Sequence, residues 1–260
     1  MMFSAIRPPD RTAEVHRGAA EAGGFGVGAW APGQHGRWAA RSCSTMATWI
    51  PEMIELLQAV DRKDSPPGNI NCATYLAAMD NISKVYDALF SIEVARRQLK
   101  SDIENSIDQI KERLLATNLD PKTTTLRELI ENELKPEVYG PEKCRDRKAR
   151  SAVIGLLWTN RAVGFVVVFM RGLHDGLTAK DAAGKAYDTL KKYHGWLTSK
   201  AVGTIMTAAP KREKILETMS ISSQEEGVQK VSPFLELIEP IVADIITMME
   251  ELGCNYPDKV

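Results

Sequence analysis

Residues 152–170, AVIGLLWTNRAVGFVVVFM, decide the fold. The stretch is apolar on nearly every side, and a helix of that kind must be covered by other helices of its domain. Asn160 and Arg161 interrupt it, which leaves fewer than the ~20 consecutive apolar residues needed to cross a bilayer. We therefore predict a long helix over 144–174, starting at the surface in the charged run KCRDRKAR (143–150) and then crossing the middle of the domain, with no transmembrane span.

The rest of the chain shows the same helical period. From Thr48 onward, apolar residues recur every three or four positions, and strand-like alternation is nearly absent. The predicted fold is all-α. Helices are expected near residues 48–62, 72–91, 94–117, 124–135, 144–174, 179–206, 210–219 and 231–252. Proline and glycine clusters separate them, at SPPGN (65–69), LDPK (119–122) and GPEK (140–143).

The first 45 residues differ in composition from the remainder. They hold seven glycines and five arginines without a sustained apolar period. Such a segment buries too little apolar surface to offset the entropy of ordering. We interpret residues 1–45 as a disordered leader, or as an upstream segment translated ahead of a start at Met46, and residues 46–260 as the folded domain.

Charge and cysteine content exclude several classes of function. The 33 basic and 34 acidic residues give a net charge of −1, so no overall positive field favours nucleic acid. The four cysteines are scattered without a CxxC pair, which leaves no zinc motif and no disulfide framework. The sequence also lacks GxSxG, HExxH, P-loop and GxGxxG motifs in a suitable context, so an enzyme is disfavoured and no cofactor is expected.

Two segments carry distinctive side chains on helices that are otherwise built for burial. Trp158 lies within the central apolar stretch, and His194 lies in LKKYHGW (190–196). Phe165 and Phe169 are one turn apart and project from roughly the same face as Trp158. That face either lines a greasy cavity or fills an ordinary core, and the spacing alone does not decide between them.

Several blocks together resemble the glycolipid transfer protein family. In order they are YLAAMDNISKVYDALFS (75–91), SDIENSIDQIK (101–111), TLRELIENEL (125–134), LLWTNRAVGFVVVF (156–169), LKKYHGW (190–196) and NYPDKV (255–260). The similarity covers about residues 71–260. It implies a two-layer helical sandwich that encloses the hydrocarbon chains of a sphingolipid, holds its headgroup at a surface cleft and moves it between membranes without chemical change.

The resemblance also implies a site for the lipid amide. The family pattern has an Asp, an Asn four residues later and a Lys three residues after that; this chain offers Asp102, Ser106 and Gln109, of which only the Asp matches. A register through Asn81 and Lys84 would put Ala77 at the acid position, and we reject it. By resemblance, Asp102 accepts the amide N–H and His194 donates to the amide carbonyl, a division that suits an acceptor-only carboxylate.

The remaining expectations concern the headgroup, the chains and the membrane. By resemblance, Trp158 stacks on the first sugar and Tyr256 lies near the site, while Phe165 and Phe169 help to line the hydrocarbon chamber. Arg161, one turn beyond Trp158, could supply a cation or belong to a structural ion pair. Four residues are candidates for contact with the membrane, an indole and three lysines: Trp196, Lys191, Lys192 and Lys200. The alternative is that the indole is packed against the protein and the lysines are simply solvated.

The sequence thus predicts a monomeric, cofactor-free sphingolipid carrier of the cytoplasm that touches membranes only transiently. Glycosylceramides are the expected cargo because an indole suits a sugar ring. Two alternatives remain open. One is transfer of ceramide 1-phosphate, whose phosphate calls for basic residues around the headgroup. The other is a lipid-sensing interaction module that binds without net transfer.

Overall fold

The computed structural model describes residues 46–90, 93–194 and 210–258, all of which belong to one compact unit. This part of the chain is helical without strands, which confirms the all-α prediction. The helices are α1 (Met46–Gln58), α2 (Cys72–Ile82), α3 (Tyr86–Leu89), α4 (Glu93–Ala116), α5 (Leu126–Leu134), α6 (Pro141–Arg145), α7 (Ala152–His174), α8 (Ala179–Lys191), α10 (Arg212–Thr218) and α11 (Gln224–Glu251), with 3₁₀ turns η1 (Ser83–Val85) and η2 (Arg147–Ala149).

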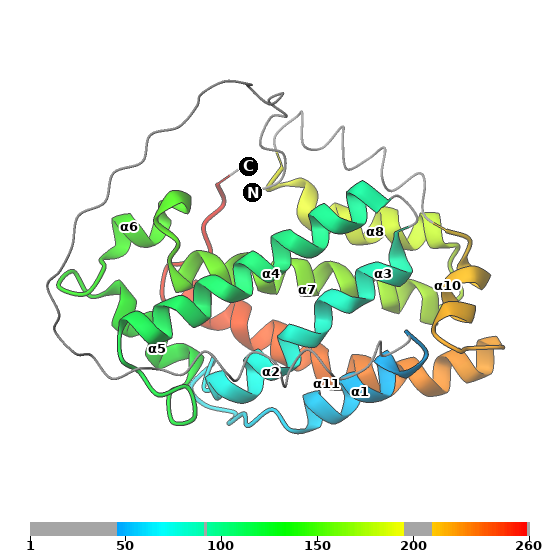
Figure 1. The fold of residues 1–260 in the computed structure, drawn as a ribbon, viewed down its shortest axis with the longest axis horizontal. Helices are drawn as coiled ribbons and strands as arrows, with labels where there is room; N and C mark the ends of the chain where they lie inside the picture. Colours follow the sequence, from blue (N-terminus) through cyan, green and yellow to red (C-terminus); the bar gives the residue numbers. More distant parts are fainter. Residues whose placement is uncertain (1–45, 91–92, 195–209, 259–260) are drawn as a thin grey trace, which may run out of the picture. The chain divides into compact units, whose positions relative to one another are not determined.

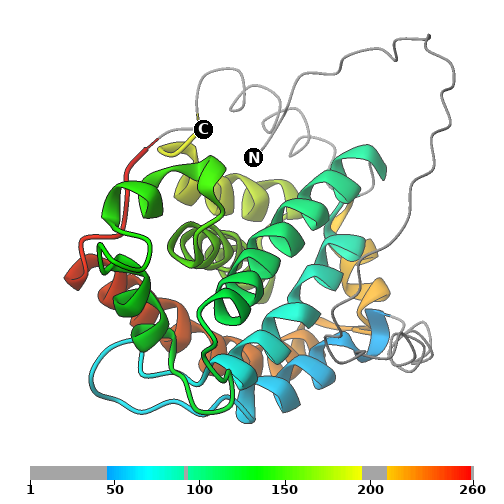
Figure 2. The same cartoon turned by 60° about the vertical axis from the view of Figure 1, so that its left-hand side comes forward.

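Helix α7 is the core of the domain. Viewed nearly end-on it lies in the middle, with α4, α8 and α11 packed around it (Figure 2). Helix α1 packs in turn along α11 and α2 (Figure 1). By length and composition α7 could cross a membrane, contrary to the expectation drawn from Asn160 and Arg161, but 78% of its most apolar window is buried inside the domain. Most of that window is therefore covered by protein.

Polar residues fix where several of the helices begin. Asn71, Ser151, Thr178 and Ser223 each accept a hydrogen bond from a backbone N–H in the first turn of α2, α7, α8 and α11. Thr125 and Glu128 form a reciprocal capping box at α5. These caps satisfy donors that a helix start leaves without partners, and each is worth about 1 kcal/mol.

The helix expected over 144–174 was wrong in its first turns. The charged run forms α6 and η2 instead, and α7 begins only at Ala152. Two features break the helix: Arg150 adopts a left-handed backbone with φ of 54°, and Ser151 caps the next helix. The side chain of Arg150 pairs with Glu112 of α4 at 2.8 Å, which fixes this corner.

Two other boundaries differ from the sequence expectation. The last helix begins at Gln224 and not near residue 231, because Ser223 caps it and Pro233 and Pro240 lie inside it without ending it. The helix expected over 72–91 is interrupted by the 3₁₀ turn η1. The helix expected over 179–206 begins as predicted, and α8 ends at Lys191. Residues 195–206 of the expected helix lie outside the described residues.

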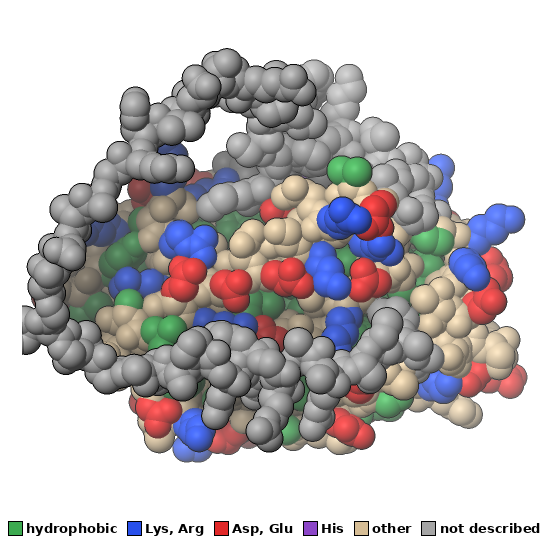
Figure 3. Space-filling view, in the orientation of Figure 1, with side chains coloured by type: hydrophobic (Ala, Val, Ile, Leu, Met, Phe, Trp, Pro, Cys, Tyr) green, Lys and Arg blue, Asp and Glu red, His purple; other side chains and the backbone are tan. Residues whose placement is uncertain are grey.

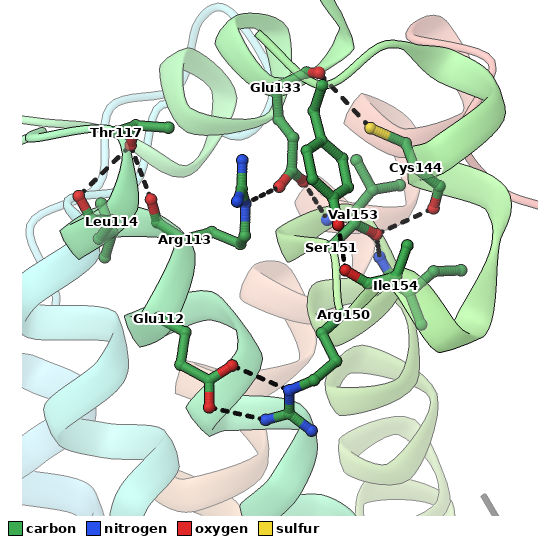
Figure 4. A network of polar contacts seen from close by, with 12 residues as sticks. Glu112, Arg113, Leu114, Thr117, Glu133, Cys144, Arg150, Ser151, Val153 and Ile154 are labelled. Atoms are coloured by element: carbon green, nitrogen blue, oxygen red, sulfur yellow. Dashed lines mark hydrogen bonds and ion pairs between the residues drawn. The ribbon is translucent and has the colours of Figure 1, made fainter.

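A polar network anchors the first turn of α7 (Figure 4). The Glu133 side chain is fully buried; one carboxylate oxygen accepts from Arg113 Nε at 2.6 Å and the other from the backbone N–H of Val153 at 3.0 Å. The Ser151 hydroxyl donates to the Cys144 carbonyl at 2.9 Å. A buried charge held by a cation and a helix N-terminus is stabilised from both sides. The network thereby fixes where α7 starts relative to α4, α5 and α6.

Helices α4 and α7 approach closely at one glycine. A Cβ added at Gly155 would lie 2.6 Å from the backbone oxygen of Ser106, so the crossing leaves no room for a side chain there. The outer face of α4 is solvated and carries both acidic and basic side chains (Figure 3). This close crossing sets the distance between α4 and α7 near Asp102, one turn before Ser106, and Trp158, one turn after Gly155.

Candidate functional site

Asp102 provides a buried acceptor on α4. Its Oδ1 accepts from Gln98 Nε2 at 2.9 Å, while Oδ2 is buried without a hydrogen-bond partner among the described residues. Burial raises the pKa of the Asp102 carboxyl to about 6, against the lowering effects of the Gln98 hydrogen bond and the nearby Arg147 charge. A carboxylate oxygen held in this way is ready to accept a hydrogen bond from a ligand N–H or O–H.

His194 provides a second buried polar group, just after α8. The side chain is 3% exposed; Nδ1 lies 3.2 Å from the Tyr187 hydroxyl, and Nε2 is buried without a partner among the described residues. Burial lowers the pKa of His194 to about 4, so the ring is neutral near pH 7 and carries one N–H. If the Tyr187 hydroxyl donates to Nδ1, the free Nε2–H is the donor.

Trp158 lies on α7 beside these groups. It is half-buried, and its ring meets the edge of Tyr193, the neighbour of His194, with centroids 6.5 Å apart. The Arg147 guanidinium, whose charge acts on Asp102, lies 5.3 Å from the Trp158 ring centroid. Arg147 thus lies beside Trp158 and acts on Asp102, while Tyr193 links Trp158 to the segment that carries His194.

Arg147 was missed by sequence reasoning. It lies in η2, within a charged run that the sequence predicts to be the solvated start of a helix. Together with Arg161, whose guanidinium lies 5.0 Å from the Trp158 centroid and 3.5 Å from that of Tyr193, it places two cations at one indole. Burial lowers the pKa of both arginines, and among the described residues neither is in an ion pair. The sequence carries no sign of the left-handed backbone at Arg150, which separates this run from α7. Without that break, Arg147 could not be placed near Trp158 from the sequence.

Ser106 and Gln109 lie on the face of α4 that packs against α7. Both are buried; the Ser106 hydroxyl donates to the Asp102 carbonyl at 2.9 Å, and Gln109 Nε2 donates to the Asn105 carbonyl at 3.3 Å. The atoms nearest to Gly155 include the Ser106 carbonyl and the Gln109 Cβ. These contacts are ones of helix packing, and the role of both residues at a headgroup stays a prediction.

The other predicted residues take varied positions. Phe165 and Phe169 are buried in the core with their rings stacked at 6.4 Å. Tyr256 is half-buried under the Arg145 guanidinium, and its backbone carbonyl accepts from Arg161. Of the residues predicted to contact membranes, two are exposed, Lys191 and Lys192. The other two, Trp196 and Lys200, lie outside the described residues.

Solved structures of known proteins share this arrangement of helices. A fungal glycolipid transfer protein, HET-C2, matches with a TM-score of 0.65 over 80% of this chain and 100% of its own, at 22% identity. Human ceramide-1-phosphate transfer protein bound to 12:0 ceramide-1-phosphate matches with a TM-score of 0.67 over 80% of this chain and 97% of its own, at 20% identity. These matches confirm the predicted helical sandwich.

Sequence comparison leads to the same family. The family model described as Glycolipid transfer protein (GLTP) matches residues 70–221. Glycolipid transfer protein of Danio rerio is 30% identical over 197 residues, 72% of this chain and 90% of that protein. Glycolipid transfer protein B of Xenopus laevis is 29% identical over 201 residues, 73% of this chain and 91% of that protein. The chain belongs to the glycolipid transfer protein family.

Proposed function

We propose that this protein carries sphingolipids between membranes and holds the lipid amide between Asp102 and His194. One observation carries the proposal: two buried polar atoms, Asp102 Oδ2 and His194 Nε2, lack partners among the described residues. Leaving such groups unsatisfied costs roughly 1–3 kcal/mol each. A secondary amide offers an N–H to the carboxylate and a carbonyl to the imidazole N–H, and so satisfies both at once.

The carrier role assigns the other residues by position. The hydrocarbon chains would lie against Phe165 and Phe169 after the helices part to admit them, since apolar packing supplies affinity while the polar pair fixes orientation. Contact with the donor membrane would be brief and electrostatic, through the exposed Lys191 and Lys192. The protein would work as a monomer in the cytoplasm without chemical change to its cargo, and gel filtration of the lipid-bound form tests the monomer.

Glycosylceramide is the headgroup that the site favours. Trp158 is half-buried, so part of its ring remains accessible. The C–H face of a sugar can stack on that part of the ring. The matched relatives named glycolipid transfer proteins agree with this choice. Residues 46–260 would form the whole lipid-binding domain, and residues 1–45 a leader; a chain starting at Met46 should then transfer lipid at the full rate.

A phosphorylated headgroup is the second candidate, and a specific observation favours it. The guanidinium groups of Arg147 and Arg161 lie 5.3 Å and 5.0 Å from the Trp158 ring centroid. Neither has an ion-pair partner among the described residues. Half-buried guanidinium groups prefer a bidentate anion such as a phosphate. The sequence alone offered only Arg161 for this purpose, so Arg147 strengthens the alternative.

Transfer between vesicles tests the proposal directly. Fluorescent galactosylceramide and ceramide 1-phosphate are moved separately from donor to acceptor vesicles by the wild-type protein and by His194→Leu. We expect the variant to lose roughly tenfold or more in transfer of either lipid, because one hydrogen bond in a buried site is lost and its acceptor left unpaired.

The matched control is His174→Leu. His174 also lies at the end of a helix, but its ring nitrogens contact Asp175 and Ser232, away from the site. It should transfer lipid at the wild-type rate. Binding of either lipid without transfer would instead indicate a lipid-sensing module, and an undiminished rate for His194→Leu would remove the amide grip from the proposal.

A further inference from the structure

A second groove lies outside the amide site, between α7, α8 and α11. Its volume is about 510 Å³, within the roughly 300–1,000 Å³ typical of ligand sites. Asp102, Trp158 and His194 are not among the residues that line it. Its floor is apolar and comes from α7 and α11: Gly164, Val167, Val168, Val242, Ile246 and Met249.

Among the described residues, the apolar side of this groove leaves space for a ligand. A Cβ added at Gly164 would meet only Val242 Cγ1 of α11, at 4.0 Å, so the packing of α7 against α11 is loose at that glycine. Ile246 is 41% exposed, which is unusual for a large apolar side chain. An apolar strip at the bottom of a groove gains free energy when an alkyl chain covers it, at about 25 cal/mol per Å² buried. One chain suits the strip, since a single row of residues from each helix forms it.

The rim of the groove carries charges of both signs. Arg161 and Lys192 are basic, while Asp188 and Glu250 are acidic. Among the described residues none of the four is in an ion pair. Arg161 does donate to Asn255 Oδ1 and to the Tyr256 carbonyl through one guanidinium nitrogen, and Glu250 accepts a hydrogen bond from Asn255 at 3.3 Å. Unpaired charges of both signs beside an apolar floor complement a headgroup that itself carries both signs. A phosphate would meet the guanidinium and ammonium groups, and a quaternary ammonium the carboxylates.

We propose that this groove binds a single-chain zwitterionic phospholipid, with its acyl chain along Gly164 and Ile246 and its phosphate at Arg161. This site is separate from the proposed amide site, so the two lipids bind together. Arg161 borders both, because its guanidinium also lies over the Trp158 and Tyr193 rings. The membrane that supplies the sphingolipid also supplies phospholipid of this chemistry.

Calorimetric titration with palmitoyl-lysophosphatidylcholine, below its critical micelle concentration, tests the proposal. The full chain is titrated both without lipid and after loading with galactosylceramide. We expect saturable binding with equal affinity in both forms. Palmitate, which has only the negative charge, and hexadecyltrimethylammonium, which has only the positive one, should each bind at least fivefold more weakly, as expected when one of two charge contacts is lost.

Two variants locate the bound chain. Gly164→Phe fills the groove from its floor, and Ile246→Asp places a charge on the floor at an exposed position that tolerates it. Both should weaken lysophospholipid binding at least tenfold. The matched control is Val228→Asp, which changes another exposed apolar residue of α11 that does not line the groove, and it should bind as the wild type does.

The outcomes separate this proposal from the proposed function. Loss of lysophospholipid binding on loading with galactosylceramide would place it in the ceramide site and overturn the groove. Wild-type affinity in both Gly164→Phe and Ile246→Asp, equal affinity for palmitate, or no saturable binding would also overturn it. Galactosylceramide transfer is measured in the same variants and should stay unchanged, whereas His194→Leu should lose transfer and keep lysophospholipid binding.

Discussion

Replacement of Gly155 by alanine tests how the crossing of α4 and α7 shapes the site. The new Cβ would lie 2.6 Å from the Ser106 carbonyl oxygen, 3.0 Å from Gln109 Cβ and 3.2 Å from Ile110 Cγ1, where ordinary contacts begin at 3.4 Å. The nearest atom belongs to the backbone of α4, so the helix itself must retreat. Overpacking of this kind costs roughly 1–3 kcal/mol.

An opposing term must be subtracted. Alanine is a better helix former than glycine by about 1 kcal/mol, so the net loss in the free energy of unfolding should be about 0–2 kcal/mol. For a domain of this size that loss lowers Tm by up to about 8 °C. The control is Gly184→Ala in α8, where a Cβ meets nothing within 4 Å, so only the gain in helix propensity remains and Tm should rise.

The same change should impair transfer. Asp102 lies one turn before Ser106, and Trp158 lies one turn after Gly155, so a wider crossing separates the acid from the indole. Thermal unfolding followed by circular dichroism, with vesicle transfer of galactosylceramide measured at a temperature where the variant is folded, provides both readouts. If Gly155→Ala is as stable as Gly184→Ala and transfers lipid normally, the close crossing does not hold the site together.

Three further changes probe the anchoring network, the acid and the headgroup cleft. Glu133→Gln removes a buried charge that pairs with Arg113 and should lower the free energy of unfolding by about 3–5 kcal/mol, measured by urea titration; a loss below 1 kcal/mol would contradict the role of the network. Burial raises the pKa of Asp102 from its unfolded value to about 6, so its contribution to stability is fully present below about pH 4 and is lost as pH rises through 6. Because a ligand N–H needs the carboxylate, galactosylceramide binding should be about tenfold weaker at pH 5 than at pH 7.5, and Asp102→Asn should bind weakly with no such change. Arg147→Gln should reduce transfer of ceramide 1-phosphate by roughly tenfold or more and that of galactosylceramide far less; equal losses for both lipids would assign Arg147 a structural role.

The sequence predicted the helical content and the central helix because apolar periodicity is a local signal. Thr178 caps α8 at its predicted start, whereas Ser151 caps α7 well after the predicted start at residue 144. It mispredicted the turns before α7, since nothing in the run 143–150 shows that Arg150 adopts a left-handed backbone. The side chain of Arg150 pairs with Glu112, and this contact joins distant parts of the chain, which local patterns do not reveal.

The candidate site depends on contacts that the sequence shows only in part. Asp102, Trp158 and His194 came from a resemblance over several blocks, and their joint role at a lipid stays a prediction. The neutral state of His194 and the unpaired oxygen of Asp102 depend on burial, which spacing does not reveal. The packing of Ser106 against Gly155 also depends on how two helices cross, which no pattern within one helix specifies.

The contacts of residues 256–258 have a practical consequence for protein engineering. Asp258 pairs with Arg145 at 2.8 Å, and the Tyr256 carbonyl accepts a hydrogen bond from Arg161, whose guanidinium lies over the Trp158 ring. Removal of residues 256–258 would therefore release both arginines and change the surroundings of the Trp158 ring. Variants designed in this segment should keep both contacts.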